Sequence, residues 1–152
     1  MPGAESLPAS SPFAEGSQAE FSLQGMVDWG ELLGRGLRAP TVITLAGDLG
    51  AGKTTLVQAI CRGYGVQEAV TSPTFALVHE YRAPRSAVFH LDLYRLDSPA
   101  QLANIGWEDI LAANALVLIE WPDRAAGQLP PATHAITLAH VADKPDIRSV
   151  SW

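Results

Sequence analysis

The residues with the clearest chemical potential form one short run, Gly47-Asp48-Leu49-Gly50-Ala51-Gly52-Lys53-Thr54, which fits the phosphate-binding pattern G-x-x-x-x-G-K-[ST] without a mismatch. Glycines let the backbone curl so that successive N–H groups point at phosphate oxygens. A helix that begins at the end of such a run adds roughly half a positive charge at its N-terminus. Lys53 would then reach the β- and γ-phosphates, and the Thr54 hydroxyl would contact Mg²⁺. The run therefore predicts a site for nucleotide phosphates.

Two carboxylates follow apolar strands and are the candidates for metal chemistry. The stretch Ala87–Leu91 leads to Asp92, and the stretch Ala115–Ile119 leads to Glu120. The carboxyl ends of parallel strands face the phosphate-binding loop, and a carboxylate just past a buried strand needs a partner such as Mg²⁺. One acid would hold the metal or its waters, and the other would orient the attacking water. The sequence does not assign which acid has which role.

Each of these acids also has a purely structural interpretation. Either carboxylate would cap the next helix or pair with Arg95 or Arg124. Arg95 has its own functional interpretation, since it would help to neutralise charge that develops on the phosphates. Trp121 follows Glu120 and either packs beside the site or belongs to the core.

The remaining candidates are a loop with the sequence Thr71-Ser72-Pro73-Thr74 and His90, which lies two residues before Asp92. The hydroxyls of Ser72 and Thr74 would sense the γ-phosphate, as switch loops do, or would serve only the turn around Pro73. His90 alternates with Asp92, so both side chains point to the same side of their strand. It either supports the site or is a core histidine.

Composition limits the class of protein. The chain has 152 residues, 47% of them hydrophobic and 17% charged, which predicts one globular domain. Ten basic against sixteen acidic side chains give a net charge of −6, and the basic residues form no run. If the pathway involves nucleic acid, another protein should hold it. No apolar run approaches the roughly 20 residues that span a bilayer. The lone cysteine, Cys61, reads as a buried apolar residue and is compatible with the cytosol.

The elements that must position these residues can be placed from periodicity. Residues 1 to about 20 lack periodic apolar positions and are expected to form a flexible leader before a single domain over residues 21–152. We expect helices over Met26–Leu37, over residues 53 to about 62 and from Ser98, and strands over Thr41–Ala46, Phe75–Tyr81, Ala87–Leu91, Ala115–Ile119, Ala135–Ala139 and Ile147–Trp152. Early strands alternate with helices and the last two form a closing antiparallel pair. This order predicts an α/β fold with a mixed, mostly parallel central sheet between helical layers.

Four segments in series resemble one known family. They are Gly47–Thr55, Ser72-Pro73-Thr74-Phe75, His90-Leu91-Asp92-Leu93-Tyr94-Arg95 and Ile119-Glu120-Trp121-Pro122. In this order and at these intervals they closely resemble the bacterial TsaE (YjeE) family. The similarity runs from about Met26 to near the C-terminus.

The resemblance implies a three-layer P-loop NTPase fold and a cytoplasmic ATPase required for N6-threonylcarbamoyladenosine at position 37 of tRNAs that read codons beginning with A. It implies ATP and Mg²⁺ as cofactors and a complex of TsaD and TsaB as partners, whose repeated turnover ATP hydrolysis supports. Contact with tRNA would be indirect. Independently of the resemblance, the sequence shows no obvious arginine finger, so the isolated chain is expected to be slow. Carried over residue by residue, the resemblance gives catalytic roles to Lys53, Asp92 and Glu120, metal roles to Thr54, Asp92 and Glu120, partner-coupled roles to Ser72, Thr74 and Trp121, and nucleotide binding to Asp48, Leu49, Gly50, Ala51, Gly52, Lys53, Thr54 and Thr55.

Three other functions share a phosphate-binding loop. A small-molecule kinase usually has an arginine-rich lid, for which Arg82 and Arg85 are the nearest candidates. A GTP-dependent switch needs an Asn-Lys-x-Asp motif, whereas Asp143-Lys144-Pro145-Asp146 lacks the asparagine and reads as a turn. A pure binding module would use nucleotide only to set a conformation.

Overall fold

A computed structural model describes residues 16–73, 77–125 and 127–152. Its seven strands are β1 (Gln18–Ser22), β2 (Thr41–Gly47), β3 (Val78–Arg82), β4 (Ala87–Asp92), β5 (Leu116–Glu120), β6 (His134–Val141) and β7 (Lys144–Ser151). Its helices are α1 (Leu23–Gly36), α2 (Lys53–Tyr64) and α3 (Trp107–Ala112), with 3-10 turns η1 (Pro99–Ile105) and η2 (Pro122–Ala125). Among the described residues no helix is both long enough and apolar enough to span a bilayer.

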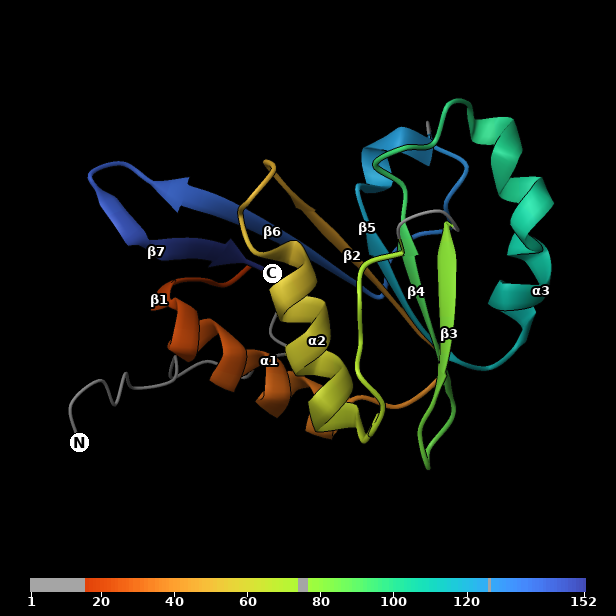
Figure 1. The fold of residues 1–152 in the computed structure, drawn as a ribbon, viewed down its shortest axis with the longest axis horizontal. Coiled ribbons are helices and arrows are strands. Elements are labelled where there is room, and N and C mark those ends of the chain that lie inside the picture. The colour runs from red at the N-terminus through yellow and green to blue at the C-terminus, as the bar shows by residue number, and fades with distance from the viewer. Residues whose placement is uncertain (1–15, 74–76, 126) are drawn as a thin grey trace.

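All seven strands form one mixed sheet in the order β1-β7-β6-β2-β5-β4-β3 (Figure 1). The four central strands run parallel, because β2 pairs in parallel with β5 and β6, and β4 pairs in parallel with β5. Antiparallel strands close both edges: β3 beside β4, and β7 with β1 beside β6. The expected mixed sheet and its closing β6–β7 pair are confirmed, with the turn between those two strands at Ala142-Asp143.

The register of the parallel strands brings the candidate acids to one edge of the sheet. Asp92 on β4 lies opposite Glu120 on β5, and Glu120 lies opposite Leu45 on β2. β2 leads directly into the phosphate-binding loop, and α2 begins at Lys53 where that loop ends. The loop and both acids therefore meet at the carboxyl edge of the parallel strands, as the sequence predicts.

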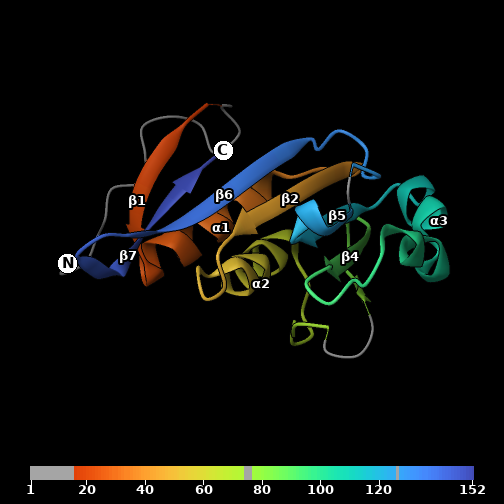
Figure 2. The ribbon, with the colours of Figure 1, turned by 90° about the horizontal axis from the view of Figure 1, so that it is seen from above.

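Two apolar clusters lie on opposite faces of the sheet. On one face α1 and α2 pack against the central strands, with Leu116 and Leu118 of β5 buried beneath them (Figure 2). On the other face Val117 and Ile119 of the same strand join a smaller cluster with η1 and α3. Every residue of β5 is buried because both of its faces are covered. Helical elements thus contact both faces, more extensively on the α1–α2 side.

Glycines on α1 and α2 lie where the two helices meet and leave no room for a side chain. A Cβ on Gly30 would come within 2.8 Å of Ala59 Cβ, and one on Gly34 would clash with the backbone carbonyl of Ile60. A Cβ on Gly63 would meet the carbonyl of Glu31. In the sequence Gly30 and Gly34 weaken the helix prediction, but in the fold their missing side chains are what allows the two helices to pack.

Several predicted boundaries were wrong. The expected leader ended too late, because Gln18–Ser22 form β1 and pair with β7; residues 1–15 lie outside the described residues. The strand expected over Phe75–Tyr81 begins at Val78 and ends at Arg82, with Phe75 itself outside the described residues. The helix expected from Ser98 is split into η1 and α3, since Gly106 between them adopts a left-handed conformation with φ of 73°.

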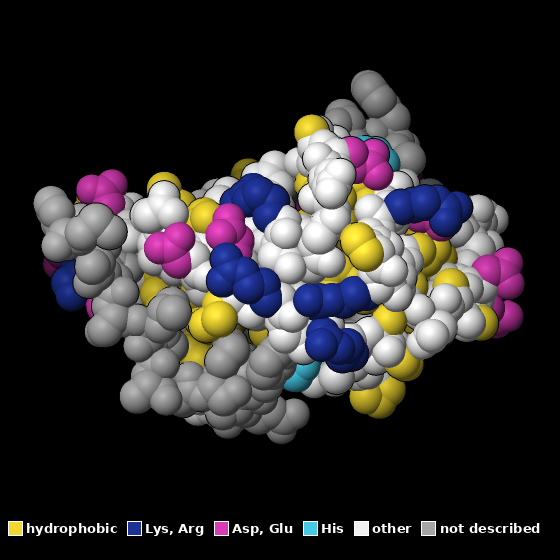
Figure 3. Space-filling model, turned by 90° about the horizontal axis from the view of Figure 1, so that it is seen from below, with side chains coloured by type: hydrophobic (Ala, Val, Ile, Leu, Met, Phe, Trp, Pro, Cys, Tyr) yellow, Lys and Arg dark blue, Asp and Glu magenta, His cyan; other side chains and the backbone are white. Residues whose placement is uncertain are grey.

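Arginines that are scattered along the sequence gather in space. Figure 3 shows basic side chains spread across the middle of the face formed by the ends of α1 and α2 and the β3–β4 hairpin. Five exposed arginines come from these segments: Arg35, Arg38, Arg62, Arg82 and Arg85. Arg85 Nη1 donates to the carbonyls of Gly34 and Leu37 at 3.1 and 3.0 Å, so it caps the C-terminal end of α1. The absence of a run in the sequence therefore does not mean that the basic residues are scattered in space.

Candidate active site

The phosphate-binding loop depends on glycines at its two ends. Gly47 has φ of 150°, and a Cβ there would clash with the carbonyl of Leu138 on β6. Gly52 has φ of 106°, and a Cβ there would lie 2.9 Å from the Met26 methyl group. Gly52 also accepts the first helical hydrogen bond of α2 from Leu56 N at 2.9 Å. Both ends of the loop are thus fixed by close backbone packing against neighbouring elements.

Lys53 is the positive group of the site and is only 5% exposed. Its Nζ donates to the carbonyls of Gly47 at 2.7 Å and Asp48 at 2.9 Å, and it lies 4.1 Å from the centre of the Trp121 ring. Burial lowers the pKa of Lys53 below its ordinary 10.5, while the charges of Glu120, Asp92 and Asp48 act in the opposite direction. A cation is thus held beside the loop at the cost of its hydration.

Glu120 is held from two sides at the end of β5, where its side chain is almost fully buried. Thr54 Oγ1 donates to its two carboxylate oxygens at 3.0 and 3.1 Å. His90 on β4 lies on the other side, with Nε2 at 2.5 Å from Oε2 of the carboxylate. Glu120 therefore connects the first turn of α2 to the neighbouring strand.

Asp92 has a different environment at the end of β4. Ser72 Oγ donates to Oδ2 at 3.0 Å, and the backbone N–H of Tyr94 donates to Oδ1 at 3.0 Å. Within the described ranges neither Asp92 nor Glu120 forms an ion pair with Arg95 or Arg124. The structural alternative based on arginine pairing is therefore wrong for both acids in these parts of the chain.

Trp121 lies directly against the site and also packs against the smaller apolar cluster. Its φ of 58° is unusual for a residue with a side chain, and its backbone N–H donates to the carbonyl of Leu45 at 3.2 Å. Its ring packs against Tyr94 with centres 5.0 Å apart and the ring planes tilted by 47°. The Arg124 guanidinium lies 5.3 Å from the Tyr94 ring and 5.9 Å from the Trp121 ring. Strained backbone of this kind is often found at functional sites.

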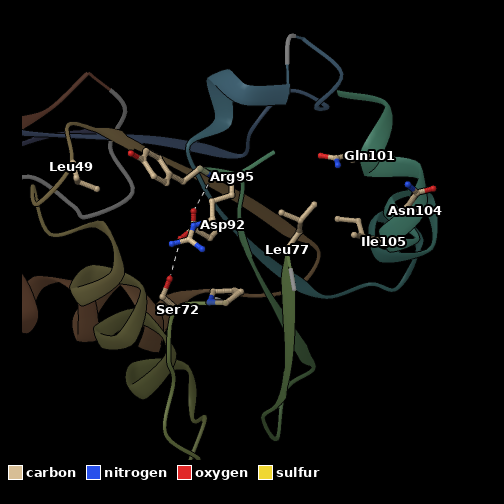
Figure 4. A pocket seen from close by; sticks show the side chains of 10 residues that line it. Leu49, Ser72, Leu77, Asp92, Arg95, Gln101, Asn104 and Ile105 are labelled. Carbon is tan, nitrogen blue, oxygen red and sulfur yellow. Dashed lines mark hydrogen bonds between the residues drawn. The ribbon is translucent and has the colours of Figure 1, made fainter. Parts of the chain in front are cut away.

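Two adjoining hollows open at this edge. The smaller, of about 350 Å³, is lined by loop residues and by Lys53, Thr54, Asp92, Glu120 and Trp121. The larger, of about 820 Å³, shares Asp92 and Ser72 with it and extends toward η1. Figure 4 shows Gln101, Asn104 and Ile105 reaching into the larger hollow from η1, opposite Ser72 and Asp92. Asp92 is thus the acid that faces both spaces.

The donor atoms around the smaller hollow suit a hard cation. The Thr54 hydroxyl and the carboxylates of Glu120 and Asp92 supply only oxygen, which is the ligand type that Mg²⁺ prefers. In the described ranges no group of three or more His, Cys, Asp or Glu side chains forms a cage for a metal ion. Mg²⁺ is usually bound through one or two carboxylates together with phosphate oxygens, so this donor set fits it.

Comparison with known proteins agrees with this geometry. The family model described as "Threonylcarbamoyl adenosine biosynthesis protein TsaE" matches residues 21–149, which include the loop, both acids and most of the sheet. This chain belongs to the TsaE family.

Individual TsaE relatives and a solved structure support the same assignment. A protein of Treponema pallidum called tRNA threonylcarbamoyladenosine biosynthesis protein TsaE is 39% identical over 80% of this chain and 90% of its own length. A TsaE of Nostoc sp. is 46% identical over 66% of this chain and 64% of its own, and one of Haemophilus influenzae is 38% identical over 72% and 70%. The crystal structure of Bacillus subtilis YdiB superimposes with a TM-score of 0.69 at 25% identity, covering 90% of this chain and 85% of that one.

The fold brings most of the residues named from the TsaE resemblance to one place. The smaller hollow is lined by all three predicted catalytic residues and by Leu49, Gly50, Gly52, Thr54, Thr55, Ser72 and Trp121. The Asp48 carbonyl accepts a hydrogen bond from Lys53 Nζ, and Ala51 is fully buried within the loop. Thr74 lies outside the described residues. Neither hollow is lined by the arginine pair suggested as a kinase lid, Arg82 and Arg85, which lies on the β3–β4 hairpin.

Two contacts around the TsaE-like site were missed. Tyr94 holds Asp92 through its backbone and packs on Trp121, although only its place in the His90–Arg95 segment pointed to it. Arg124 stacks over both rings instead of pairing with an acid. A turn that folds back on the site after β5 brings these side chains together, and no sequence periodicity reports such a turn.

Proposed function

We propose that this chain is a P-loop ATPase that hydrolyses ATP with Mg²⁺ in the formation of N6-threonylcarbamoyladenosine at position 37 of tRNAs that read codons beginning with A. The observation that carries the proposal is the contact of Thr54 with Glu120 beside Lys53. A hydroxyl, a carboxylate and an ammonium then line one small hollow at the N-terminus of α2. Family membership supplies the pathway.

Lys53 and the loop bind the phosphates in this proposal. The ammonium leaves the carbonyls of Gly47 and Asp48 and contacts the β- and γ-phosphate oxygens, where its charge is worth more because the site is shielded from water. Backbone N–H groups of the loop and the N-terminus of α2 complete the anion site. Bound Mg²⁺ would supply Lewis-acid stabilisation of charge on the phosphates.

The two acids divide the remaining work. Glu120 is buried and already contacts the Thr54 hydroxyl, so we assign it, with Thr54, to holding Mg²⁺ or its waters. Asp92 faces the larger hollow as well as the smaller one, so we assign it to orienting the attacking water, with a metal contact as its second role. Ser72 holds the Asp92 carboxylate and thereby couples the loop that precedes β3 to hydrolysis.

We further propose a complex of TsaD and TsaB as the partner, with the chain acting in the cytoplasm and meeting tRNA only through these proteins. The net charge of −6 supports this, because tRNA binding depends chiefly on basic side chains that are available to phosphates. Three of the five arginines that gather in space already have partners within the chain, since Arg35 and Arg62 pair with Glu31 and Arg85 caps α1.

Turnover by the isolated chain is slow, because an arginine is needed to neutralise charge on the phosphates in the transition state. Among the described residues, no arginine lines the smaller hollow, and Arg95 lines only the larger one. A partner supplies the missing charge or acts through Ser72 on Asp92.

The test is ATP turnover with and without purified TsaB and TsaD, at fixed Mg²⁺ and in EDTA. The proposal predicts slow Mg²⁺-dependent release of phosphate that the partners accelerate. Fast turnover that the partners leave unchanged contradicts the coupling, and undetectable turnover even with partners indicates a pure binding module. GTP that binds as tightly as ATP, or more tightly, would contradict the choice of nucleotide.

A small-molecule kinase is the second candidate, and the 820 Å³ hollow beside Asp92 favours it because an acceptor would fit there. A coupled assay with nucleosides and small metabolites separates the two functions. ADP release that depends on an acceptor and yields a phosphorylated product supports the kinase, whereas phosphate release without an acceptor supports the ATPase.

A further inference from the structure

His90 is a buried titratable residue whose contact with Glu120 has no role in the function proposed so far. The imidazole is 0% exposed, and its Nε2 lies 2.5 Å from Oε2 of Glu120. A carboxylate can only accept, so Nε2 carries the proton and donates. A donor to a charged acceptor forms one of the stronger hydrogen bonds in proteins.

The contact restricts the rotation of the Glu120 carboxylate. Thr54 Oγ1 approaches both carboxylate oxygens from α2, while His90 approaches Oε2 alone from β4. With Oε2 fixed in this way, the carboxylate keeps both of its oxygens within hydrogen-bond distance of Thr54 Oγ1. The register supports the arrangement, since His90 lies opposite Leu118, two residues before Glu120.

A simple packing role does not account for a histidine at this position. The second ring nitrogen, Nδ1, is buried and has no hydrogen-bond partner among the described atoms. A buried polar atom without a partner costs stability that an apolar side chain of similar size would avoid. The strand is otherwise apolar at this level, as Val88 and Leu91 are both fully buried. The single bond to Glu120 is therefore the feature that distinguishes His90 from a leucine.

We propose that His90 is a positioning residue that holds Glu120 in the orientation that binds Mg²⁺ together with Thr54. The inference rests on the proposed function. His90 contacts neither hollow, so it acts only through Glu120. Residues that orient metal ligands in this way typically change metal affinity or activity about 10–100-fold when they are replaced.

The experiment measures Mn²⁺ binding in the presence of saturating ADP by electron paramagnetic resonance, which reports free Mn²⁺ without any turnover. His90→Gln keeps an amide N–H near the position of Nε2, whereas His90→Asn places its amide near Nδ1 and cannot reach Glu120. His90→Leu removes the donor and keeps the volume. Val88→Ala, on the same strand and side, is the control for a packing defect.

We expect His90→Leu and His90→Asn to weaken Mn²⁺ binding about 10–100-fold, with His90→Gln and Val88→Ala close to wild type. ADP affinity in EDTA should be equal in all of them, because His90 does not touch the loop. Should His90→Leu fail to fold, the comparison of His90→Asn with His90→Gln decides. Wild-type Mn²⁺ affinity in His90→Asn overturns the assignment. A wild-type protein that binds no Mn²⁺ with ADP contradicts the proposed function itself.

Discussion

Charged side chains are buried at the carboxyl edge of the parallel strands and exposed at the amino edge. At the carboxyl edge Lys53, Glu120 and His90 are nearly or fully buried. Lys53 is held by the loop carbonyls, and Glu120 is held by His90 and the Thr54 hydroxyl. At the amino edge Arg35 and Arg85 are exposed, and Arg85 satisfies the carbonyls at the end of α1. The first arrangement costs hydration and prepares a site, whereas the second stabilises helix ends in water.

The contrast between the two edges predicts which substitutions should lower activity and which should lower stability. Buried charges that are not needed for folding are retained for binding or catalysis, often at the expense of stability. Exposed arginines near helix C-terminal ends are expected to contribute modestly to stability and to leave the chemistry unchanged. The predictions below test each side of that division.

The largest effect is expected at Lys53. Lys53→Ala should lower ATP hydrolysis by about 10²–10³-fold or more, because no other described residue that lines the smaller hollow is positively charged. Steady-state phosphate release checks this, with Arg62→Ala at the amino edge as the control that keeps its activity. If Lys53→Ala turns over ATP at the wild-type rate, the catalytic site lies elsewhere.

Glu120→Gln comes next and should weaken hydrolysis more than ADP binding. The amide keeps the shape of the carboxylate but loses the charge that we propose holds Mg²⁺, so a loss of about 10–100-fold in activity is expected. Calorimetry with ADP in EDTA and phosphate release with ATP and Mg²⁺ give the two quantities. Equal losses in both would assign Glu120 to the structure of the site instead.

A smaller effect, on stability alone, is expected at the amino edge. Arg85→Ala removes two hydrogen bonds to the end of α1 and a guanidinium that lies 5.2 Å from the Tyr64 ring. The free energy of unfolding should fall by about 1–2 kcal/mol, with ATP turnover unchanged. Urea denaturation and phosphate release measure both. A loss of activity without a loss of stability would contradict the claim that the amino edge serves stability alone.

The smallest effect is the pH dependence of stability that Lys53 contributes. Because its pKa in the folded protein lies below 10.5, the unfolded chain binds more protons at this position between the two values. In that window the free energy of unfolding of the wild type should rise with pH relative to Lys53→Met, in which the other titrating groups are the same. Urea denaturation from pH 8 to 10 measures the difference between the two proteins. If the free energy of unfolding of the wild type instead falls with pH relative to Lys53→Met, burial does not lower the pKa of Lys53.

Much of this architecture follows from local sequence, and the rest depends on contacts between distant segments. The β-branched run Thr41–Ala46 and the glycine pattern after it predict the strand, loop and start of α2 because each depends on neighbouring residues. β1 was missed because its five residues become a strand only by pairing with β7. Gly34 shows the same limit, since it weakens an isolated helix yet permits the contact with α2.

The site divides in the same way. The type and spacing of Lys53, Asp92 and Glu120 predict their meeting at one edge, because parallel strands align their carboxyl ends. The partners of these residues could not be predicted. The Thr54–Glu120 and His90–Glu120 contacts depend on strand register and helix placement, and the ring of Trp121 over Lys53 depends on the conformation of a single residue with positive φ.

The most direct test of the account is a Mg²⁺ titration of single-turnover ATP hydrolysis by the wild type, Glu120→Gln and Asp92→Asn. The account predicts that Glu120→Gln shifts the midpoint to higher Mg²⁺, because Glu120 with Thr54 holds the ion. Asp92→Asn should keep a midpoint near that of the wild type and reach a lower plateau, because Asp92 chiefly orients the water. A shifted midpoint in Asp92→Asn with an unchanged midpoint in Glu120→Gln would contradict the account.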